Sequence, residues 1–414
     1  MGDIFIKNIN SNTETRLGTI EQESDPILNH DEISVVFQRN QNLYNISISE
    51  QGLTQSTYFT KADYKDNEKL NDQDKWLEEN QLAIFDLFKK EKRNNSKTNQ
   101  TLSKCYFPKS SSISNISTDP TTRFAVFTIA DQPEKSRNII VPNYVTRFGY
   151  TEDIPGRIKV GSYVQTFATK IYDLKKDTIY DVLTGNIPEI KRPPKYLEEY
   201  PQQLKKLKNE NLDKEIYVGE SLRSPIESIA IVNIVSLDNK DQWIMKLDPL
   251  SGKLSSLDHQ HDESWIGGPC VGRRYRTPEI GWIDGRTIYL QSEETGYSHL
   301  HKLNIDTGQK KQLTSGKYEA LTLQLSNDKK SFYFSANTEH LGITHFYEIP
   351  VAGGKLIKLT LMKGGNEVTI SPDEKWLVIR YSSTTQRHLQ IDLCQNLAQC
   401  YRVPYLLLGR LYHR

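Results

Sequence analysis

The sequence predicts an all-β fold, a β-propeller built from four-stranded blades, complete or partial, with short helical insertions. Apolar and polar residues alternate over short runs such as HLHKLNI, and Gly, Asn and Asp interrupt them. This alternation is typical of antiparallel strands joined by hairpins. Two strand patterns also recur, and one copy of each makes a repeat of roughly 45 residues, the usual length of a propeller blade. A chain of 414 residues is long enough for such a repetitive fold.

The two patterns differ in where their turns lie. The first is an aromatic or apolar strand, a turn rich in Gly, Asn or Thr, and a strand that ends in Leu. It occurs in DIFIKNINSNTETRL, HLHKLNIDTGQKKQL and THFYEIPVAGGKLIKL. The second is a polar turn that leads into an apolar strand, as in ILNHDEISVVFQRN, ISTDPTTRFAVFTI, LQLSNDKKSFYFSA and VTISPDEKWLVIRYS. The pair supplies four strands, which justifies the blade as the repeating unit.

Two segments interrupt this pattern and predict helical insertions. Residues 63–97 have Asp72 as a candidate N-cap, followed by an apolar face of Leu77, Ile84, Phe85 and Phe88. Residues 191–213 are charged and contain three prolines, which predicts a surface insertion with a short helix. We expect its basic run, Lys205, Lys206 and Lys208, to be a solvated face rather than a binding patch.

Composition restricts the classes of partner. The formal net charge is +1 with 25% charged residues, so no overall field attracts nucleic acid. No apolar run is long enough to span a membrane, and the N-terminus has no signal-peptide pattern. The four cysteines, Cys105, Cys270, Cys394 and Cys400, form no CxxC pair, which argues against a zinc ribbon and leaves the compartment open.

No serine nucleophile motif is present. A G-x-S-x-G pentapeptide at a strand-to-helix turn exposes the nucleophile of α/β-hydrolases, and the sequence contains none. The nearest match is GPCVG, which places Cys270 at the nucleophile position. Its flanks, ESWIG and RRYRT, predict neither a buried parallel strand nor an amphipathic helix. We therefore expect a Gly/Pro loop, and treat a cysteine hydrolase as a remote alternative.

Polar clusters supply the remaining candidate sites. The H-x-H pairs His259/His261 in DHQHDE and His299/His301 in SHLH each resemble half of a zinc site, but no further ligand is implied, so we expect no metal and no cofactor. Paired carboxylates suit an ammonium group, and arginines suit a carboxylate. The candidate substrate-binding residues are Glu152, Asp153, Arg273, Arg274, Glu293 and Glu294, with exposed loop charge as the alternative.

The blade motifs together resemble a known family. SEETGYSHLHKLNIDTGQKKQLTSGKYE is similar to a blade from the N-terminal β-propeller of the prolyl oligopeptidase and dipeptidyl peptidase IV family of serine peptidases. SPDEKWLVIRYSS, PVAGGKLIKLT, PEIGWIDGRTIYLQ and VPNYVTRFGYTEDIPGRIKVG carry the same resemblance, as does the segment around DQDKWLEENQLAIFD. The likeness is to bacterial, dipeptidyl peptidase IV-like members and runs from about Asp3 to about Thr385.

The resemblance implies a propeller followed by an α/β-hydrolase domain that carries the catalytic Ser, Asp and His. It implies that the propeller gates and positions peptide substrates, and that the enzyme is exported to the periplasm or secreted. We expect residues 1–388 to form this propeller and residues 389–414 to be a divergent tail, from a shifted reading frame or a truncated gene. With no hydrolase sequence, we expect no catalytic residue here. The expected partners are a peptide substrate and the hydrolase domain of the full-length enzyme. The alternative is a free-standing propeller that binds a peptide or protein.

Overall fold

The chain forms two compact units, Met1–Asp181 and Val182–Arg414. The computed structural model describes residues 3–8, 11–17, 23–29, 33–50, 52–62, 105–108, 111–119, 121–131, 138–159, 165–272, 278–385, 390–395 and 399–402. The predicted helix of residues 63–97 lies outside these ranges. In the described ranges, no helix is both long and apolar enough to cross a membrane.

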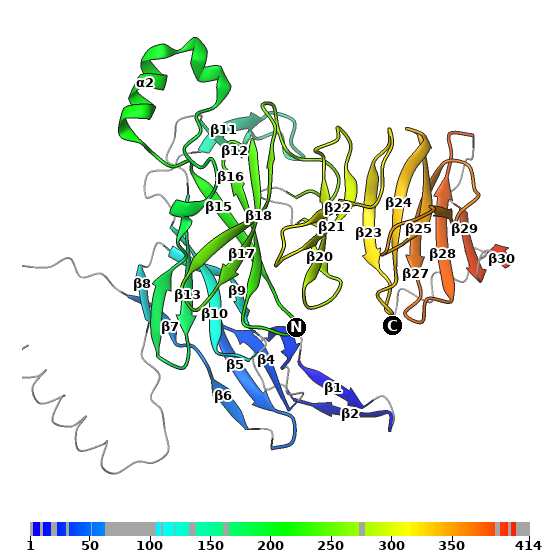
Figure 1. The fold of residues 1–414 in the computed structure, drawn as a ribbon, viewed down its shortest axis with the longest axis horizontal. Coiled ribbons are helices and arrows are strands. Elements are labelled where there is room, and N and C mark those ends of the chain that lie inside the picture. Colours follow the sequence, from blue (N-terminus) through cyan, green and yellow to red (C-terminus); the bar gives the residue numbers. More distant parts are fainter. Residues whose placement is uncertain are drawn as a thin grey trace, which may run out of the picture. The chain divides into compact units, whose positions relative to one another are not determined.

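The second unit consists of four-stranded antiparallel sheets that follow one another in chain order (Figure 1). The third and fourth sheets are joined by a single parallel residue pair, Thr344 and Gly365. The strands are β15 (Ile216–Arg223), β16 (Ala230–Ser236), β17 (Asp241–Asp248) and β18 (Lys253–His261); β19 (Gly281–Trp282), β20 (Thr287–Ser292), β21 (His299–Asn304) and β22 (Lys310–Gln312); β23 (Ala320–Leu325), β24 (Ser331–His340), β25 (Ile343–Pro350) and β26 (Ile357–Lys358); and β27 (Gly365–Ile370), β28 (Trp376–Ser382), β29 (Gln390–Gln395) and β30 (Gln399–Arg402). These sheets confirm the predicted all-β fold of four-stranded blades.

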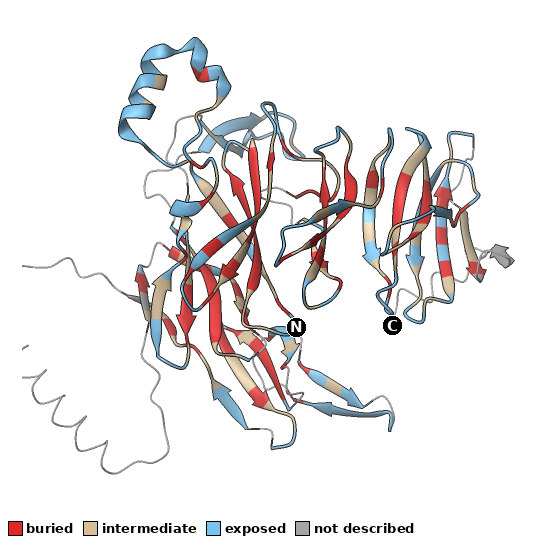
Figure 2. Cartoon of the chain, viewed as in Figure 1, coloured by how far each residue is buried: buried red, intermediate tan, exposed pale blue. Residues whose placement is uncertain are grey.

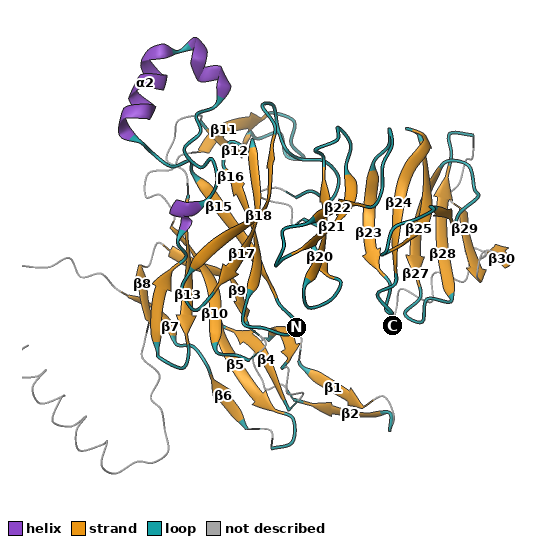
Figure 3. Ribbon diagram, in the orientation of Figure 1, coloured by secondary structure: helices purple, strands orange, loops and turns teal. Residues whose placement is uncertain are grey.

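In the described part of the first unit there are two further four-stranded antiparallel sheets and three two-stranded sheets. One sheet is β3 (Ser24–Leu28), β4 (Ser34–Arg39), β5 (Asn42–Ser47) and β6 (Leu53–Gln55), and the other is β9 (Ser111–Thr118), β10 (Phe124–Asp131), β13 (Thr166–Asp173) and β14 (Thr178–Asp181). The pairs are β1 (Phe5–Asn8) with β2 (Thr13–Arg16), β7 (Phe59–Ala62) with β8 (Cys105–Pro108), and β11 (Asn138–Asn143) with β12 (Glu152–Ile158). Strands dominate the described part of both units (Figure 3).

A repeated polar turn joins consecutive strands in the second unit. In the turn before β24, Ser326 Oγ donates to Asp328 Oδ1 at 2.8 Å and accepts the Ser331 N–H at 3.0 Å. The turn before β28 repeats this arrangement with Ser371 and Asp373 at 2.6 Å. The fourth residue of each turn has positive φ, +58° at Lys329 and +56° at Glu374, and the neighbouring hydrogen bonds hold this conformation in place. Side-chain chemistry therefore sets where these hairpins turn.

Burial concentrates on the middle strands of the sheets (Figure 2). Every residue of β16 is buried, so both faces of this strand are covered. In β24 the buried residues Phe332 and Phe334 alternate with the half-buried Ser331 and Tyr333. Alternation therefore appears where only one face is well covered, and a continuous apolar run appears where both are.

The charged segment 191–213 contains the 3₁₀ helix η2 (Lys195–Glu199) and the helix α2 (Pro201–Glu210). Pro201 occupies the first helical turn, where its missing N–H costs nothing, and Asn211 ends the helix in the left-handed conformation at φ +49°. No residue of α2 is buried, and Lys205, Lys206 and Lys208 are exposed.

The predicted tail contributes to the last sheet. β29 pairs with β28 over six residues, with Leu377 opposite Cys394, and β30 pairs with β29. Backbone hydrogen bonds build these strands, and Ile391 and Leu393 of β29 alternate with Gln390 and Asp392, a short alternation that our separation of residues 389–414 did not take into account. The shifted reading frame stays a prediction.

Candidate functional site

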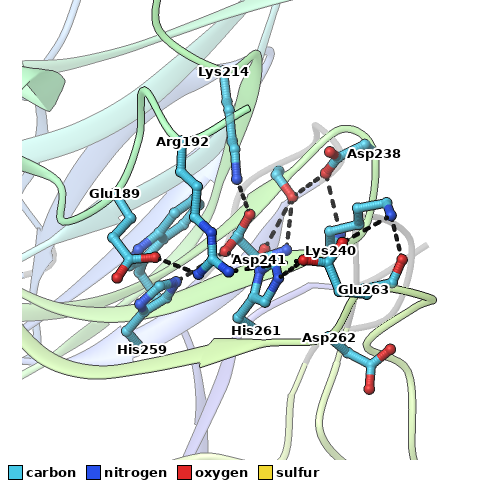
Figure 4. A network of polar contacts seen from close by, with 12 residues as sticks. Glu189, Arg192, Lys214, Asp238, Lys240, Asp241, His259, His261, Asp262 and Glu263 are labelled. Carbon is cyan, nitrogen blue, oxygen red and sulfur yellow. Dashed lines mark hydrogen bonds and ion pairs between the residues drawn. The ribbon is translucent and has the colours of Figure 1, made fainter. Parts of the chain in front are cut away.

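A network of polar contacts gathers around Asp241, at one end of the sheet β15–β18 (Figure 4). Asp241 begins β17 and lies opposite His261 at the end of β18, while Trp243 lies opposite His259. Because side chains alternate between faces of a strand, these four residues share one face of the sheet. The H-x-H spacing in β18 therefore brings both imidazoles to one carboxylate.

The Asp241 carboxylate is fully buried and has three partners. His259 Nε2 lies 3.0 Å and His261 Nδ1 lies 2.8 Å from the same oxygen, Oδ1. The other oxygen, Oδ2, accepts a hydrogen bond from Lys214 Nζ, whose side chain is 11% exposed. This carboxylate is therefore the centre on which two histidines and one lysine converge.

The partners keep this carboxyl ionised. Burial by itself would raise the pKa of Asp241, but the hydrogen bonds from His259, Lys214 and His261 outweigh burial and hold the pKa well below its usual range. Asp241 is thus a fixed negative charge inside the protein rather than a proton-transfer group near neutral pH.

A second layer of charges extends from His261 to the surface. His261 Nε2 lies 3.2 Å from Glu263 Oε1, and Glu263 also faces Lys240 Nζ at 3.7 Å and Arg192 Nη2 at 3.7 Å. Arg192 in turn donates to Glu189 Oε2 at 2.7 Å. The His261 hydrogen bond is the main reason that the pKa of Glu263 is lowered. Opposite charges therefore alternate along Glu263, Arg192 and Glu189.

The segment before β15 covers this face of the sheet. Trp243 Nε1 donates to the Pro188 carbonyl at 2.9 Å, and the Trp243 ring stacks on His259 with centroids 5.2 Å apart. The Lys214 N–H donates to the Ile190 carbonyl at 2.8 Å. Ile187, Ile190 and Leu197 of the segment are buried. Apolar packing and the charged network together dock residues 182–214 on the sheet.

The arrangement is suited to holding segments together. The turn before Asp241 contains one serine of this network. Ser236 Oγ donates to Asp238 Oδ1 at 2.5 Å and accepts the Asp241 N–H at 2.9 Å, as Ser326 and Ser371 do in the turns before β24 and β28. Among the described residues, no group of three or more His, Cys, Asp or Glu side chains is arranged to hold a metal ion. Asp262 accepts the N–H groups of Ser264 and Trp265 and shapes the loop after β18.

The acidic pair Glu293–Glu294 is separated by its partners. Glu293 Oε2 accepts the Gly267 N–H at 3.1 Å. Glu294 Oε2 accepts a hydrogen bond from Lys310 Nζ at 2.7 Å. Burial would raise the pKa of Glu294, but Lys310 outweighs it and lowers the pKa. Each carboxylate is thus engaged by this chain's own groups.

Two of the other candidate residues, Glu152 and Asp153, belong to the first unit. Glu152 and Asp153 are exposed on β12, opposite Asn143 and Pro142 of β11. As neighbours on a strand, they face opposite sides of the ribbon. Arg273 and Arg274 lie outside the described residues.

The second H-x-H pair belongs to the scaffold. His299 Nδ1 lies 3.1 Å from Thr314 Oγ1, and Nε2 lies 3.0 Å from the Gly316 carbonyl. His345 and Thr360, also fifteen residues apart, repeat this contact, with 3.0 Å between His345 Nδ1 and Thr360 Oγ1. His301 Nδ1 is bonded to the His299 carbonyl at 3.0 Å, and burial followed by the charge of Lys310 lowers the pKa of His301. These histidines tie strand ends together.

Cys270 lies in the loop between β18 and β19 and is buried, with 2% of its surface exposed. Its thiol donates to the Leu321 carbonyl at 2.8 Å, and Gln242 Nε2 donates to the neighbouring Val271 carbonyl at 2.7 Å. The backbone of Cys270 has φ +60°. This loop is anchored to β17 and β23, and its cysteine faces a backbone carbonyl inside the protein.

Sequence reasoning missed Lys214, Asp241 and Arg192. A signal for Asp241 was present, because SLDNKD repeats the turn pattern of SNDKKS and SPDEKW but places an aspartate where Ser331 and Trp376 stand. A charged residue at the first, buried position of a strand requires a partner. Lys214 is 27 residues away, and no local pattern identifies it.

Comparison with known proteins places this fold in context. Residues 206–388 match the family described as the dipeptidyl peptidase IV (DPP IV) N-terminal region. The crystal structure of Porphyromonas gingivalis dipeptidyl peptidase 4 is similar, with a TM-score of 0.56 and 15% identity over 99% of this chain and 49% of that chain. The crystal structure of a putative dipeptidyl aminopeptidase IV from Bacteroides ovatus is also similar, with a TM-score of 0.54 and 13% identity over 95% of this chain and 48% of that chain. This chain therefore spans about half the length of these structures. No curated protein sequence matches it.

Proposed function

Because residues 206–388 match the N-terminal region of dipeptidyl peptidase IV, we propose that this chain is the non-catalytic propeller portion of a serine-type peptidase. In this function it gates and positions peptide substrates for an α/β-hydrolase domain, by restricting access and orienting the bound peptide. The family match carries the proposal, and it covers β15 to β28 with their intervening turns. The absence of G-x-S-x-G from the printed sequence agrees with it.

For substrate contact we assign Glu152 and Asp153 rather than Glu293 and Glu294. The latter carboxylates are engaged by the Gly267 N–H and Lys310, whereas Glu152 and Asp153 are exposed. Exposed aromatic residues precede them, Tyr144, Phe148 and Tyr150. A carboxylate beside aromatic rings suits a cationic amine, such as the free amino terminus of a peptide.

Binding of labelled peptides tests this assignment. Purified chain is titrated with a fluorescent peptide that has a free amino terminus, and with its acetylated counterpart, by fluorescence anisotropy. We expect the free amine to bind more tightly, and either Glu152→Gln or Asp153→Asn to remove that preference. Glu198→Gln is the matched control, because Glu198 is an exposed acid on η2. Equal affinity for both peptides would contradict the assignment.

A separate assay tests the absence of catalysis. The chain is incubated with a chromogenic dipeptidyl amide, with and without a serine-reactive phosphonate. No release of chromophore is expected. Hydrolysis that co-purifies with the chain and is abolished by the phosphonate would overturn the non-catalytic function, whatever the peptide-binding result.

A further inference from the structure

His261 lies between two carboxylates. Its Nδ1 is 2.8 Å from Asp241 Oδ1 and its Nε2 is 3.2 Å from Glu263 Oε1. A neutral imidazole carries one N–H, so its other nitrogen would present a lone pair to a carboxylate oxygen. Only the imidazolium donates to both. The geometry therefore fits the protonated ring.

We propose that His261 is a proton-dependent clamp that fastens the loop after β18 and the segment of residues 182–214 to the end of the sheet β15–β18. The protonated ring closes the clamp by binding Asp241 and Glu263 together, and loss of the proton opens it. The inference does not depend on the peptidase proposal.

The contacts of Glu263 show what the clamp holds. Glu263 belongs to the loop after β18 and faces Arg192 of the covering segment at 3.7 Å. It also faces Lys240, whose Nζ donates to the Glu263 carbonyl. From the other side, Lys214 at the end of the same segment binds Asp241. Two residues of the covering segment, Arg192 and Lys214, are thus joined to the carboxylates that His261 bridges.

Charged groups of both signs surround the two imidazoles. The groups that face the two imidazoles or their partners are the carboxylates Asp238, Asp241, Glu189 and Glu263 and the cations Arg192, Lys214 and Lys240, whereas the Asp262 carboxylate points away and accepts N–H groups of its own loop (Figure 4). Carboxylates outnumber cations, so with neutral histidines the cluster is negative. A proton on His261 would bring the net charge of the cluster closer to zero.

His259 provides an internal comparison. Its Nε2 lies 3.0 Å from the same Asp241 oxygen, and its ring stacks on Trp243. The neutral tautomer with a proton on Nε2 satisfies this single carboxylate contact. The bridge between two carboxylates is therefore specific to His261.

Hydrogen exchange on the full chain tests the clamp. Backbone protection of residues 182–214 and 262–272, corrected for intrinsic exchange, is compared at about pH 5.5 and about pH 8.5, on either side of ordinary histidine titration. We expect several-fold weaker protection at the higher pH. His261→Gln, whose amide cannot gain or lose a proton in this pH range, should show weak protection at both pH values, and His259→Gln should keep the pH dependence.

Protection of β23–β28 in the same experiment reports whether each variant is folded. Unchanged pH dependence in a folded His261→Gln variant, or protection in the unmodified chain that is independent of pH, would overturn the clamp. Nitrogen-15 NMR of labelled histidine in the unmodified chain is independent of any variant. Both ring nitrogens of His261 should carry a proton at about pH 5.5, and a spectrum with one protonated nitrogen would refute the proposal.

Discussion

Asp241→Asn is the substitution with the largest predicted effect on stability. Asparagine has nearly the same shape, so packing against Trp243 and the β17–β18 pairing should persist. The negative charge is lost, while Lys214 keeps its positive charge at 11% side-chain exposure. A buried charge that loses its partner is strongly unfavourable, because the interior solvates it poorly.

The expected cost is about 3–5 kcal/mol in the free energy of unfolding near neutral pH, the range for breaking a buried ion pair. The pKa of Asp241 is depressed in the folded protein, so its contribution is present above the ordinary aspartate pKa of about 3.9 and is lost as the pH falls. At about pH 3 the unfolding free energies of the unmodified chain and of Asp241→Asn should differ by about 1 kcal/mol less than they do near neutral pH.

Urea denaturation followed by tryptophan fluorescence measures this cost. Four of the five tryptophans, Trp243, Trp265, Trp282 and Trp376, lie in the second unit, so the signal reports mainly that unit. Lys214→Met and the double variant complete a double-mutant cycle. Removing both charges together should cost less than Asp241→Asn alone, since neither charge is then left unpaired.

Additive costs in this cycle would refute the argument, because they would mean that Lys214 and Asp241 do not interact. The matched control is Glu210→Gln on α2. Its Oε1 lies 3.9 Å from Lys206 Nζ, and the Lys206 side chain is 75% exposed. Exposed pairs of this kind contribute little, so no measurable change is expected.

Three further predictions concern the scaffold. Thr360→Val should lower the free energy of unfolding, measured by urea denaturation, by about 1–3 kcal/mol, because the buried Thr360 Oγ1 accepts the Phe346 N–H at 3.0 Å. The control Thr295→Val changes an exposed threonine and should have little effect. Equal effects of the two substitutions would contradict this reasoning. Burial and Lys358 lower the pKa of His345, so its contribution is present above about pH 6.5 and is lost as the pH falls. In His345→Asn the asparagine could bind Thr360 as Asn42 binds the Thr57 hydroxyl. This variant should therefore lose less stability than the unmodified chain between about pH 7 and pH 5. An NMR titration midpoint for His345 at or above its ordinary value would exclude this explanation. Cys270 should react with an aromatic disulfide reagent only as fast as the protein opens, because its thiol is buried and donates to Leu321; a rapid burst at Cys270 would contradict this.

Local pattern was sufficient for the strands and hairpins. The turns SNDKKS and SPDEKW were predicted from composition, and the structure shows why: their serine and aspartate side chains bind groups within five residues. The apolar strands β24 and β28 follow each turn at once. All the interactions that decide these hairpins lie within a short stretch of chain, where sequence spacing is a good measure of distance in space.

The candidate site was predicted only in part. The cluster DHQHDE was recognised as polar, and the alternation within β18 places His259 and His261 on one face. Their shared partner lies on the neighbouring strand, and Lys214 and Arg192 come from the covering segment. The acidic residues Glu293 and Glu294 look alike in sequence, but Gly267 and Lys310 engage them separately.

The sequence by itself determined the all-β architecture, because period-two alternation and turn chemistry act between near neighbours. Only the tertiary structure decided that Asp241 is a buried anion, that His261 bridges two carboxylates, and that Cys270 faces a carbonyl. Electrostatic and hydrogen-bond energies depend on separations of a few ångströms and on exclusion of water. For Lys214 and Asp241, 27 residues apart in the chain, folding alone determines that separation.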